Sequence, residues 1–217
     1  MLTKYKNKIT FISTHRIAYQ IIQEQSKVLS IGWGRGFVEY YLEKNKKCEI
    51  KGIDVLKKKL VKIKNYKKKN LNLIRFNKLN YDYLLLLDVL EHLDDPYNFL
   101  YKIRRSINGQ KKNTLIISVP NIANIWIRLN LLLGNFDYSE RGILDKTHKI
   151  FFTLDSLKKM IHRQGFLIKK IYYIPIPFPL FIKNEYFSLF FINIYNIFTQ
   201  LFSKIFSYQY LIVVEKN

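Results

Sequence analysis

The chain has 217 residues, of which 37 are Lys or Arg and 16 are Asp or Glu, so its formal net charge is +21 at pH 7. This length fits one domain with a sizeable core, and the one cysteine, Cys48, excludes an intrachain disulfide and suits a reducing cytoplasm. The start, MLTKYKNKITFIST, lacks the long apolar run and cleavage site of a secretory signal. We therefore expect a cytoplasmic location.

The basic charge has two explanations. Binding to nucleic acid or to an anionic membrane would favour it, but a composition rich in Lys, Ile, Asn, Tyr and Phe would also produce it without any partner. The densest basic run, residues 57–69, has apolar residues at helical spacing and is predicted to be a solvent-facing helix. No RNA-binding module with stacking aromatics accompanies it, so we expect no specific nucleic-acid partner.

The N-terminal part of the chain leads into a buried strand. Residues 1–26 are predicted to form an extension with a helix around 15–25. Its His15 and Arg16 are either exposed capping residues or ligands of an acidic group at the central site. The apolar run at residues 27–31 then predicts the first strand.

Three glycines, Gly32, Gly34 and Gly36, follow that strand, and a helix is predicted directly after them. Such a turn lets a ligand approach bare backbone, and the helix N-terminus presents unpaired N–H groups to it. An ordinary strand–helix connection would have the same pattern. The next strand, residues 49–54, ends at Asp54, 18 residues after Gly36, where a carboxylate can accept hydrogen bonds from the two hydroxyls of a ribose.

The rest of the chain continues this alternation, which predicts an α/β fold. The apolar run at residues 81–87 is typical of a central parallel strand covered on both faces. The further strands are predicted at 72–76, 81–87, 114–119, 167–174 and 209–215, and the helices at 94–107, 124–133 and 154–163.

Asp88, Glu91 and His92 follow the central strand. Their spacing puts the three side chains on one face if the segment is helical. Three interpretations are open: helix capping by the acids, contact with a cofactor and a substrate, or a divalent-metal site of carboxylate and imidazole ligands.

Together these motifs resemble the class I S-adenosylmethionine (SAM)-dependent methyltransferases. More narrowly, they resemble the branch that contains the ubiquinone-pathway O-methyltransferases and the methyltransferases of sugar and surface-polysaccharide pathways. The resemblance extends over residues 12–174, with a family-like last strand. It rests on VLSIGWGRG (28–36), GIDV (52–55), YDYLLLLDVLEHLDDP (81–96), LIISVPN (115–121) and RGILDKTHKIFFTLDSLKKMIHRQGF (141–166).

The resemblance implies a Rossmann-like, doubly wound, seven-stranded sheet of order 3-2-1-4-5-7-6 with the last strand antiparallel. The methyltransferase domain would comprise residues 27–174 and 208–217, with an insertion at 175–207. SAM would be the cofactor. A small molecule would be the acceptor of the methyl group, through a hydroxyl or, as a second choice, an amine.

The resemblance also implies which residues contact the cofactor. Asp54 would hold the ribose, Asn77 would accept a hydrogen bond from the adenine amine, and Asp88 would form the floor of the crevice. The implied set is Ser30, Gly32, Trp33, Gly34, Gly36, Asp54, Val55, Asn77, Asp88 and Val89.

Two residues depart from the family pattern. Ser30 stands where the family usually has an acid that helps to hold the cofactor's amino group, and Trp33 stands where it has Cys or another small residue. Both departures favour an alternative, a degenerate and non-catalytic methyltransferase fold that acts as an interaction or membrane-associated protein.

Methyl transfer to a hydroxyl also needs a base. His148, in the polar segment 134–149, is the first candidate because imidazole titrates near neutrality; a structural hydrogen bond is the alternative role. Asp145 and Arg141 would orient His148 or bind substrate. His92 is the second catalytic candidate.

A metal ion is a weaker expectation, and we assign no metal ligand. A Glu-x-x-Glu-His pattern in the quinone-pathway relatives is associated with metal dependence. Asp88, Glu91 and His92 form a similar pattern in this chain, so Mg²⁺ remains an open possibility.

Two other enzyme classes fit less well. An RNA methyltransferase is suggested by charge alone, without an Asn/Asp-Pro-Pro-Tyr signature. An NAD enzyme would need a third glycine at the dinucleotide spacing, which GWGRG lacks.

The insertion at 175–207 is the most unusual stretch. Its prolines exclude an interior strand, and residues 186–203 carry no charge and place Phe, Ile and Leu at helical spacing. Interrupting Asn, Thr and Gln argue against a membrane-spanning helix. A peripheral helix at the inner face of a membrane, flanked by Lys183 and Lys204, is one interpretation; packing on the domain or in a dimer is the other.

Overall fold

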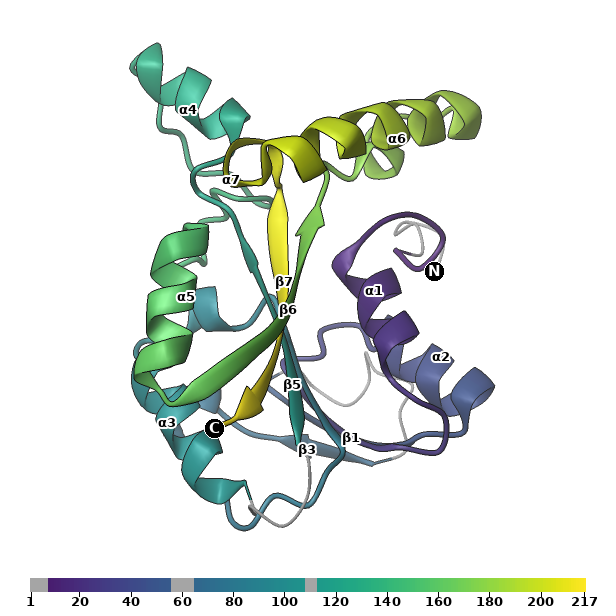
Figure 1. The fold of residues 1–217 in the computed structure, drawn as a ribbon, viewed down its shortest axis with the longest axis vertical. Coiled ribbons are helices and arrows are strands. Elements are labelled where there is room, and N and C mark those ends of the chain that lie inside the picture. The colour runs from purple at the N-terminus through teal and green to yellow at the C-terminus, as the bar shows by residue number, and fades with distance from the viewer. Residues whose placement is uncertain (1–7, 56–64, 108–112) are drawn as a thin grey trace.

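The computed structural model describes residues 8–55, 65–107 and 113–217, and a seven-stranded sheet runs through its centre (Figure 1). The strand order is β3-β2-β1-β4-β5-β7-β6, and β7 pairs antiparallel with both β5 and β6 while the other pairs are parallel. This confirms the predicted fold class and strand order. The strands are β1 (Lys27–Ile31), β2 (Glu49–Asp54), β3 (Tyr66–Lys68), β4 (Tyr83–Leu87), β5 (Thr114–Pro120), β6 (Phe166–Ile174) and β7 (Gln209–Lys216).

The helices begin where local capping signals predict them. The Thr153 hydroxyl accepts a hydrogen bond from the backbone N–H of Ser156, whose own side chain accepts from the backbone of Thr153, a capping box that starts α5. Asp95 caps α3, which has Pro96 in its first turn. The α-helices are α1 (Thr14–Ile21), α2 (Phe37–Lys46), α3 (Pro96–Ser106), α4 (Ile125–Leu132), α5 (Leu154–Arg163), α6 (Glu185–Leu201) and α7 (Ser203–Phe206), and the 3-10 turns are η2 (Leu71–Leu73), η3 (Leu90–His92) and η4 (Phe178–Leu180).

Helices cover the sheet on both faces, with α1 and α2 on one side and α3 and α5 on the other (Figure 1). Successive residues of a strand point to opposite faces, so Leu84 and Leu86 join one buried core cluster and Leu85 joins the other. Both faces of β4 are therefore apolar, which explains its continuous run of leucines.

Three helices lie together at one end of the molecule. The helices α4, α6 and α7 sit beyond the edge of the sheet where β5 ends and β7 begins (Figure 1). This is the edge formed by the carboxyl ends of the parallel strands. Among the described residues, no helix is both long enough and apolar enough to cross a membrane.

The third strand differs from the sequence prediction, which favours a helix over 57–69 and a strand at 72–76. The structure has a short edge strand at Tyr66–Lys68, paired with β2 from Gly52 to Asp54. Its lysines are exposed because an outer strand faces water, so no apolar run marks it. The predicted strand is instead the turn η2 and an extended segment that buries Ile74; residues 56–64 of the predicted helix lie outside the described residues.

Candidate functional site

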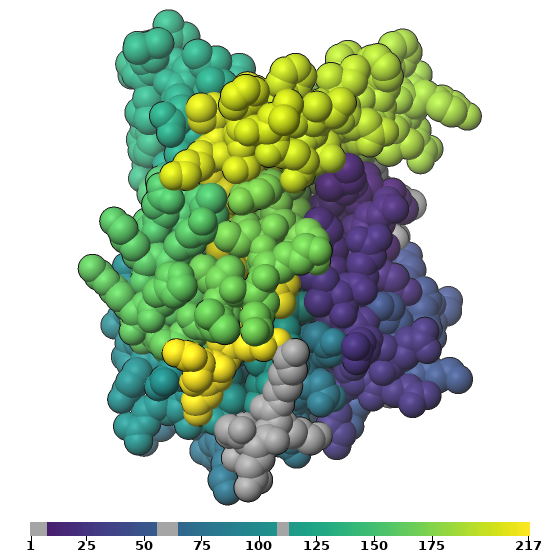
Figure 2. All heavy atoms as spheres, viewed as in Figure 1, coloured from purple at the N-terminus to yellow at the C-terminus, as the bar shows by residue number. Residues whose placement is uncertain are grey.

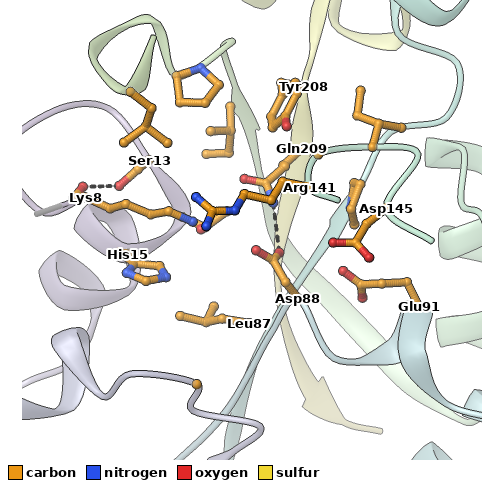
Figure 3. Close-up of a pocket in the computed structure, with 18 of the residues that line it drawn as sticks. Lys8, Ser13, His15, Leu87, Asp88, Glu91, Arg141, Asp145, Tyr208 and Gln209 are labelled. Carbon is orange, nitrogen blue, oxygen red and sulfur yellow. Dashed lines mark hydrogen bonds between the residues drawn. The ribbon is translucent and has the colours of Figure 1, made fainter. Parts of the chain in front are cut away.

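A cavity of about 1040 Å³ lies at the carboxyl ends of the parallel strands. The turns after β1 and β4 both line it, and these two strands are neighbours in the sheet. The loops after β1 and β4, which sequence analysis places at the central site, therefore line one cavity at the point where the strand order reverses. Figure 3 shows one end near Lys8, Ser13 and His15, the other near Glu91 and Asp145, and Asp88 between them.

The glycine turn forms the first of these ends. Gly32, Gly34 and Gly36 have φ values of +71°, +56° and +69°, a backbone conformation that side chains disfavour. A Cβ on Gly32 would lie 2.5 Å from a methyl group of Val89, so the turn after β1 packs directly against the turn after β4. A Cβ on Gly34 would meet nothing within 4 Å. The backbone at Gly34 is thus open to a ligand, while the side chain of Val89 packs against the turn at Gly32.

Asp54 fixes the shape of this turn. Its carboxylate accepts a hydrogen bond of 2.9 Å from the backbone N–H of Gly34, and the residue is buried at the end of β2. Asp54 thus lies behind the cavity wall and is linked to that wall by its hydrogen bond to Gly34. The next residue, Val55, is exposed.

The bulk of Trp33 is accommodated outside the turn. Its ring stacks on Tyr66 with centroids 5.2 Å apart, and it lies over Gly52, where a Cβ would come within 2.5 Å of the indole. A glycine at position 52 is therefore a condition for tryptophan at position 33. The residue lines the cavity but is nearly buried, because its ring packs on Gly52 of β2 and Tyr66 of β3.

Glu39 supplies an acid beside Ser30. The Ser30 hydroxyl donates a 2.5 Å hydrogen bond to the carboxylate of Glu39, which reaches it from the first turn of α2. Both residues are buried and line the cavity. Burial raises the pKa of Glu39 to about 7, although the bond from Ser30 opposes this shift. Sequence analysis missed Glu39; its signal is an acid placed on the inward side of α2, next to the buried Val38.

Nitrogen-bearing side chains of the N-terminal segment line the same cavity. His15 of α1 lines the cavity, and its Nδ1 is buried without a hydrogen-bond partner among the described residues. Burial, followed by the charge of Lys8, lowers the pKa of His15 to about 3, so the ring is neutral. Arg16 points elsewhere and donates to the carbonyl of Thr10. Arg141 extends into the cavity from the opposite side (Figure 3).

Asp88 occupies the middle of the cavity in a left-handed conformation, with φ of +56°. Its carboxylate accepts hydrogen bonds from the hydroxyl of Ser118, at 2.6 Å, and from the side-chain amide of Gln209, at 2.9 Å. These donors come from β5 and β7, so three strands hold one carboxylate in place (Figure 3). The position agrees with the predicted crevice floor.

The other end of the cavity gathers Glu91, His92 and His148. Their ligand-capable atoms lie within 4.8 Å of one another, and the two imidazole rings are 4.8 Å apart between centroids. The sequence interpretation groups Asp88 with Glu91 and His92 on one helical face. The structure has a 3-10 turn instead, which separates Asp88 from this cluster and lets His148 join it.

Glu91 is the most unusual member of this cluster. Both of its carboxylate oxygens are buried and have no hydrogen-bond partner among the described residues. Burial, with the nearby charge of Asp88, raises its pKa well above the usual value. Burial therefore favours the protonated, neutral form of this side chain.

His148 is held in one tautomer by its surroundings. Its Nδ1 lies 2.9 Å from the carbonyl oxygen of Ile143, which can accept but cannot donate, so Nδ1 carries a proton and Nε2 carries the lone pair. Burial lowers the pKa of His148, and the Ile143 carbonyl opposes this only in part. The imidazole is therefore neutral near pH 7 and able to accept a proton at Nε2.

A hydrogen-bonded loop supports the two histidines. The Thr147 hydroxyl donates to Asp145 at 2.6 Å and lies 3.2 Å from Nδ1 of His92. Burial alone would raise the pKa of Asp145, but the hydrogen bonds from Thr147 outweigh it and lower that pKa. Asp145 thus stays ionised and fixes the loop that carries His148.

Asn77 is not brought to this cavity. It lines a second, smaller cavity of about 170 Å³, together with Leu29, Lys51 and Ile53. The structure therefore gathers most of the predicted site residues in one cavity, sets Asp54 and Val89 behind its wall, and leaves Val55 and Asn77 outside it.

Comparison of the chain with known protein families gives one match. A family model described as "Methyltransferase domain" matches residues 3–170. The chain belongs to this methyltransferase-domain family. A search of curated proteins finds no match.

Solved structures show the same fold. A SAM-dependent methyltransferase from Archaeoglobus fulgidus is 22% identical, with 93% of this chain and 90% of that chain covered and a TM-score of 0.59. A possible histamine N-methyltransferase from Thermotoga maritima is 16% identical, with coverages of 96% and 91% and a TM-score of 0.60.

A third structure holds a cofactor product. It is the 1,6-didemethyltoxoflavin-N1-methyltransferase of Burkholderia thailandensis with bound S-adenosylhomocysteine (SAH), 14% identical, with coverages of 96% and 80% and a TM-score of 0.59. The fold is therefore that of SAM-dependent methyltransferases. The narrower resemblance to ubiquinone- and polysaccharide-pathway enzymes stays a prediction.

Proposed function

We propose that this protein binds SAM and transfers its methyl group to a hydroxyl of a small molecule, with an amine as the second choice of acceptor. One observation carries the proposal: a glycine turn with open backbone and a neutral imidazole with a free Nε2 line the same cavity. Single-ligand pockets have volumes of about 300–1,000 Å³. A cavity of about 1040 Å³ has room for a cofactor and an acceptor side by side.

The glycine end would hold the cofactor. Gly34 offers bare backbone, and Asp54 is placed at the end of β2 to bind a ribose once Gly34 moves or shares its hydrogen bond. Asp88, in the middle of the cavity, lies where cofactor and acceptor would meet. When bound, SAM would supply a methyl group on a positively charged sulfur, so that an O–CH3 bond could form in line as the S–CH3 bond breaks and SAH leaves as a thioether.

Glu39 would compensate for the missing acid at position 30. An ammonium group binds a carboxylate more strongly than it binds a hydroxyl, and Glu39 lies 2.5 Å from the Ser30 hydroxyl. The family's acid is thus replaced by a serine and a glutamate that act as a pair. This removes the main reason to regard the fold as degenerate, and the placement of Trp33 beside Tyr66 removes the other.

His148 would be the base. His148 lines the same cavity as the glycine turn, and its lowered pKa favours the unprotonated imidazole near pH 7. A positioned base contributes roughly 10²–10⁴-fold to a rate, and orientation of donor and acceptor contributes about 7–11 kcal/mol. Most of the rate enhancement would therefore come from how the cavity holds the two molecules.

Mg²⁺ has no part in this proposal. The cluster of Glu91, His92 and His148 offers two nitrogen ligands and one carboxylate, whereas Mg²⁺ prefers oxygen ligands in octahedral geometry. The donor set does not fit this ion. We expect methyl transfer to survive treatment with EDTA.

Calorimetric titration of the purified chain with SAM and SAH tests the proposal. We expect both to bind with a Kd of roughly micromolar order. A folded sample that binds neither compound at millimolar concentration would instead support the non-catalytic alternative. If both bind, transfer of labelled methyl from SAM to sugars, lipid-linked intermediates and quinone precursors identifies the acceptor.

A further inference from the structure

The helix α6 turns most of its large apolar side chains outward, and its buried residues are two hydroxyl residues, Ser188 and Thr199, together with Ile192. Ser188 and Thr199 are buried, and they donate their hydroxyls to backbone carbonyls of their own helix, at 2.8 and 2.9 Å. Surface helices normally turn polar residues outward and apolar residues inward. Here the outward residues are Phe187, Phe190, Phe191, Ile194, Ile197, Phe198 and Leu201, each at least 40% exposed.

A second helix exposes apolar side chains at the same end of the molecule. Trp126 and Leu132 of α4 are 65% and 82% exposed, and Figure 1 shows α4 and α6 together beyond the carboxyl ends of the parallel strands. In Figure 2, α6 forms a ridge that extends past the body of the protein. We call the exposed apolar side chains of α4 and α6 the aromatic face. Apolar surfaces of this extent mark binding sites in water-exposed proteins.

The charges around the aromatic face indicate what binds there. No residue from 186 to 203 is charged, while Lys183 and Lys204 flank α6 and Arg128 lies on α4. The acids beside these residues are Glu185 and Asp155, of which Asp155 pairs with Lys204 at 2.8 Å, and the whole chain carries a net charge of +21. An apolar centre, basic edges and a strongly basic protein complement the surface of an anionic bilayer.

We propose that the aromatic face docks onto an anionic lipid bilayer, with α6 lying in the plane of the headgroups. The helix has 17 residues and does not meet the requirements for spanning a membrane. In the interface its phenylalanines would leave water, and its buried hydroxyls would keep their present partners. The helix therefore needs no refolding to bind.

Docking in this orientation would also direct the cavity to the membrane. Trp126 of α4 lines the cavity, and so do Leu180 and Phe181, which lead into α6. This part of the inference rests on the proposed function. The acceptor would be carried on a lipid, and its hydroxyl would enter between α4 and the segment before α6 without the lipid leaving the bilayer.

Flotation with vesicles tests the docking. We expect the chain to float with vesicles that contain phosphatidylglycerol and much less with pure phosphatidylcholine, and high salt should weaken binding. The double variant Phe190→Ser, Phe198→Ser should lower vesicle affinity on the order of 10- to 100-fold, because two large apolar side chains no longer leave water. The matched control is Leu73→Ser, Leu167→Ser, which removes two exposed leucines outside the aromatic face and should bind as the parent does.

Two results would overturn the docking proposal. One is a folded chain that does not float with anionic vesicles at low salt. The other is a dimer, seen by sedimentation without lipid, that the double variant dissociates; a second copy would then cover the aromatic face. Titration with SAH in lipid-free buffer separates this question from the proposed function, because SAH binding without flotation rejects the docking alone, and flotation without SAH binding rejects the methyltransferase alone.

Discussion

The two ends of the cavity are built in opposite ways. At the glycine end, two hydrogen bonds hold polar groups in place: Gly34 to Asp54 and Ser30 to Glu39. At the acceptor end, by which we mean the opening between α4 and the segment before α6, apolar side chains such as Trp126 and Phe181 line the cavity and remain exposed. The first end is attached to β1, β2 and α2, whereas the second is made of segments inserted between later strands.

The difference indicates which end the fold determines. Residues at strand ends inherit their positions from the sheet, so any chain with this fold presents a turn and an acid there. Segments between strands vary freely, because loops tolerate change and carry specificity. The methyltransferase-domain family therefore predicts the class of cofactor, whereas the acceptor has to be found by experiment.

The largest expected effect is a loss of methyl-transfer rate without a loss of SAH affinity. His148→Ala should lower the rate of methyl transfer by roughly 10²–10⁴-fold, since it removes the proposed base, while SAH affinity stays as in the parent. Single-turnover assays and calorimetry measure the two quantities. His162→Ala, on the exposed side of α5, is the control and should affect neither. Equal loss of rate and of SAH affinity would mean that His148 is a structural residue.

The next effect probes the glycine end. Asp54→Ala removes the carboxylate that holds Gly34 and would bind ribose; a hydrogen bond to a charged group contributes about 1.5–3 kcal/mol, so SAM affinity should fall by roughly 10- to 100-fold. Calorimetry measures it, with circular dichroism to verify folding. Glu49→Ala, at the exposed start of the same strand, is the matched control. Unchanged SAM affinity would remove Asp54 from the site.

A smaller effect should depend on pH. The pKa of Glu39 is raised to about 7 in the folded protein, above its unfolded value, so the folded state holds the proton more tightly and the free energy of unfolding falls as pH rises towards 7. The ionised carboxylate binds an ammonium group, so SAH affinity should rise with pH through about 7. Glu39→Gln should lower the affinity above that pH by roughly tenfold and flatten this dependence.

The matched substitution for Glu39 is Glu43→Gln, a half-buried acid one turn later on α2 that does not line the cavity. It should leave both the affinity and its pH dependence unchanged. If SAH affinity of the Glu39→Gln variant depended on pH as it does in the parent, another group would hold the ammonium.

The smallest effect is expected at the acceptor end. Trp126→Ala should leave SAH affinity unchanged, because the ring is 65% exposed and lies on α4, away from the glycine turn. Calorimetry with SAH measures this. A clear loss of SAH affinity would mean that the two ends of the cavity are not independent.

Much of the fold could be predicted because the signals are local. The apolar run of β1 and the capping threonine of α5 each depend on neighbours in sequence, and the predicted bounds of both elements agree with the structure. The edge strand β3 could not be recognised, since its position depends on pairing with β2 and its lysines point to water. Residues 71–76 resemble a strand because Ile74 and its apolar neighbours pack on the core without joining the sheet.

Part of the candidate site could likewise be located from the sequence. Glycines and acids at strand ends could be located from spacing, because the sheet brings them together. Glu39 could not, since its importance depends on a serine nine residues earlier and on burial by the fold. The grouping of Glu91 and His92 with His148 depends on a 3-10 turn and on a loop more than fifty residues away, and neither is visible in local periodicity.

The position of β7 sets the order in which the protein can mature. This strand follows every other element in the chain, yet it lies between β5 and β6 and supplies Gln209 to Asp88, and Tyr208 directly before it lines the cavity. During synthesis the N-terminal strands can pair early, but β6 has no neighbour in the sheet until β7 leaves the ribosome. A nascent chain would therefore hold a nearly complete glycine turn and no closed cavity, and ligand binding would begin only after translation of the last strand.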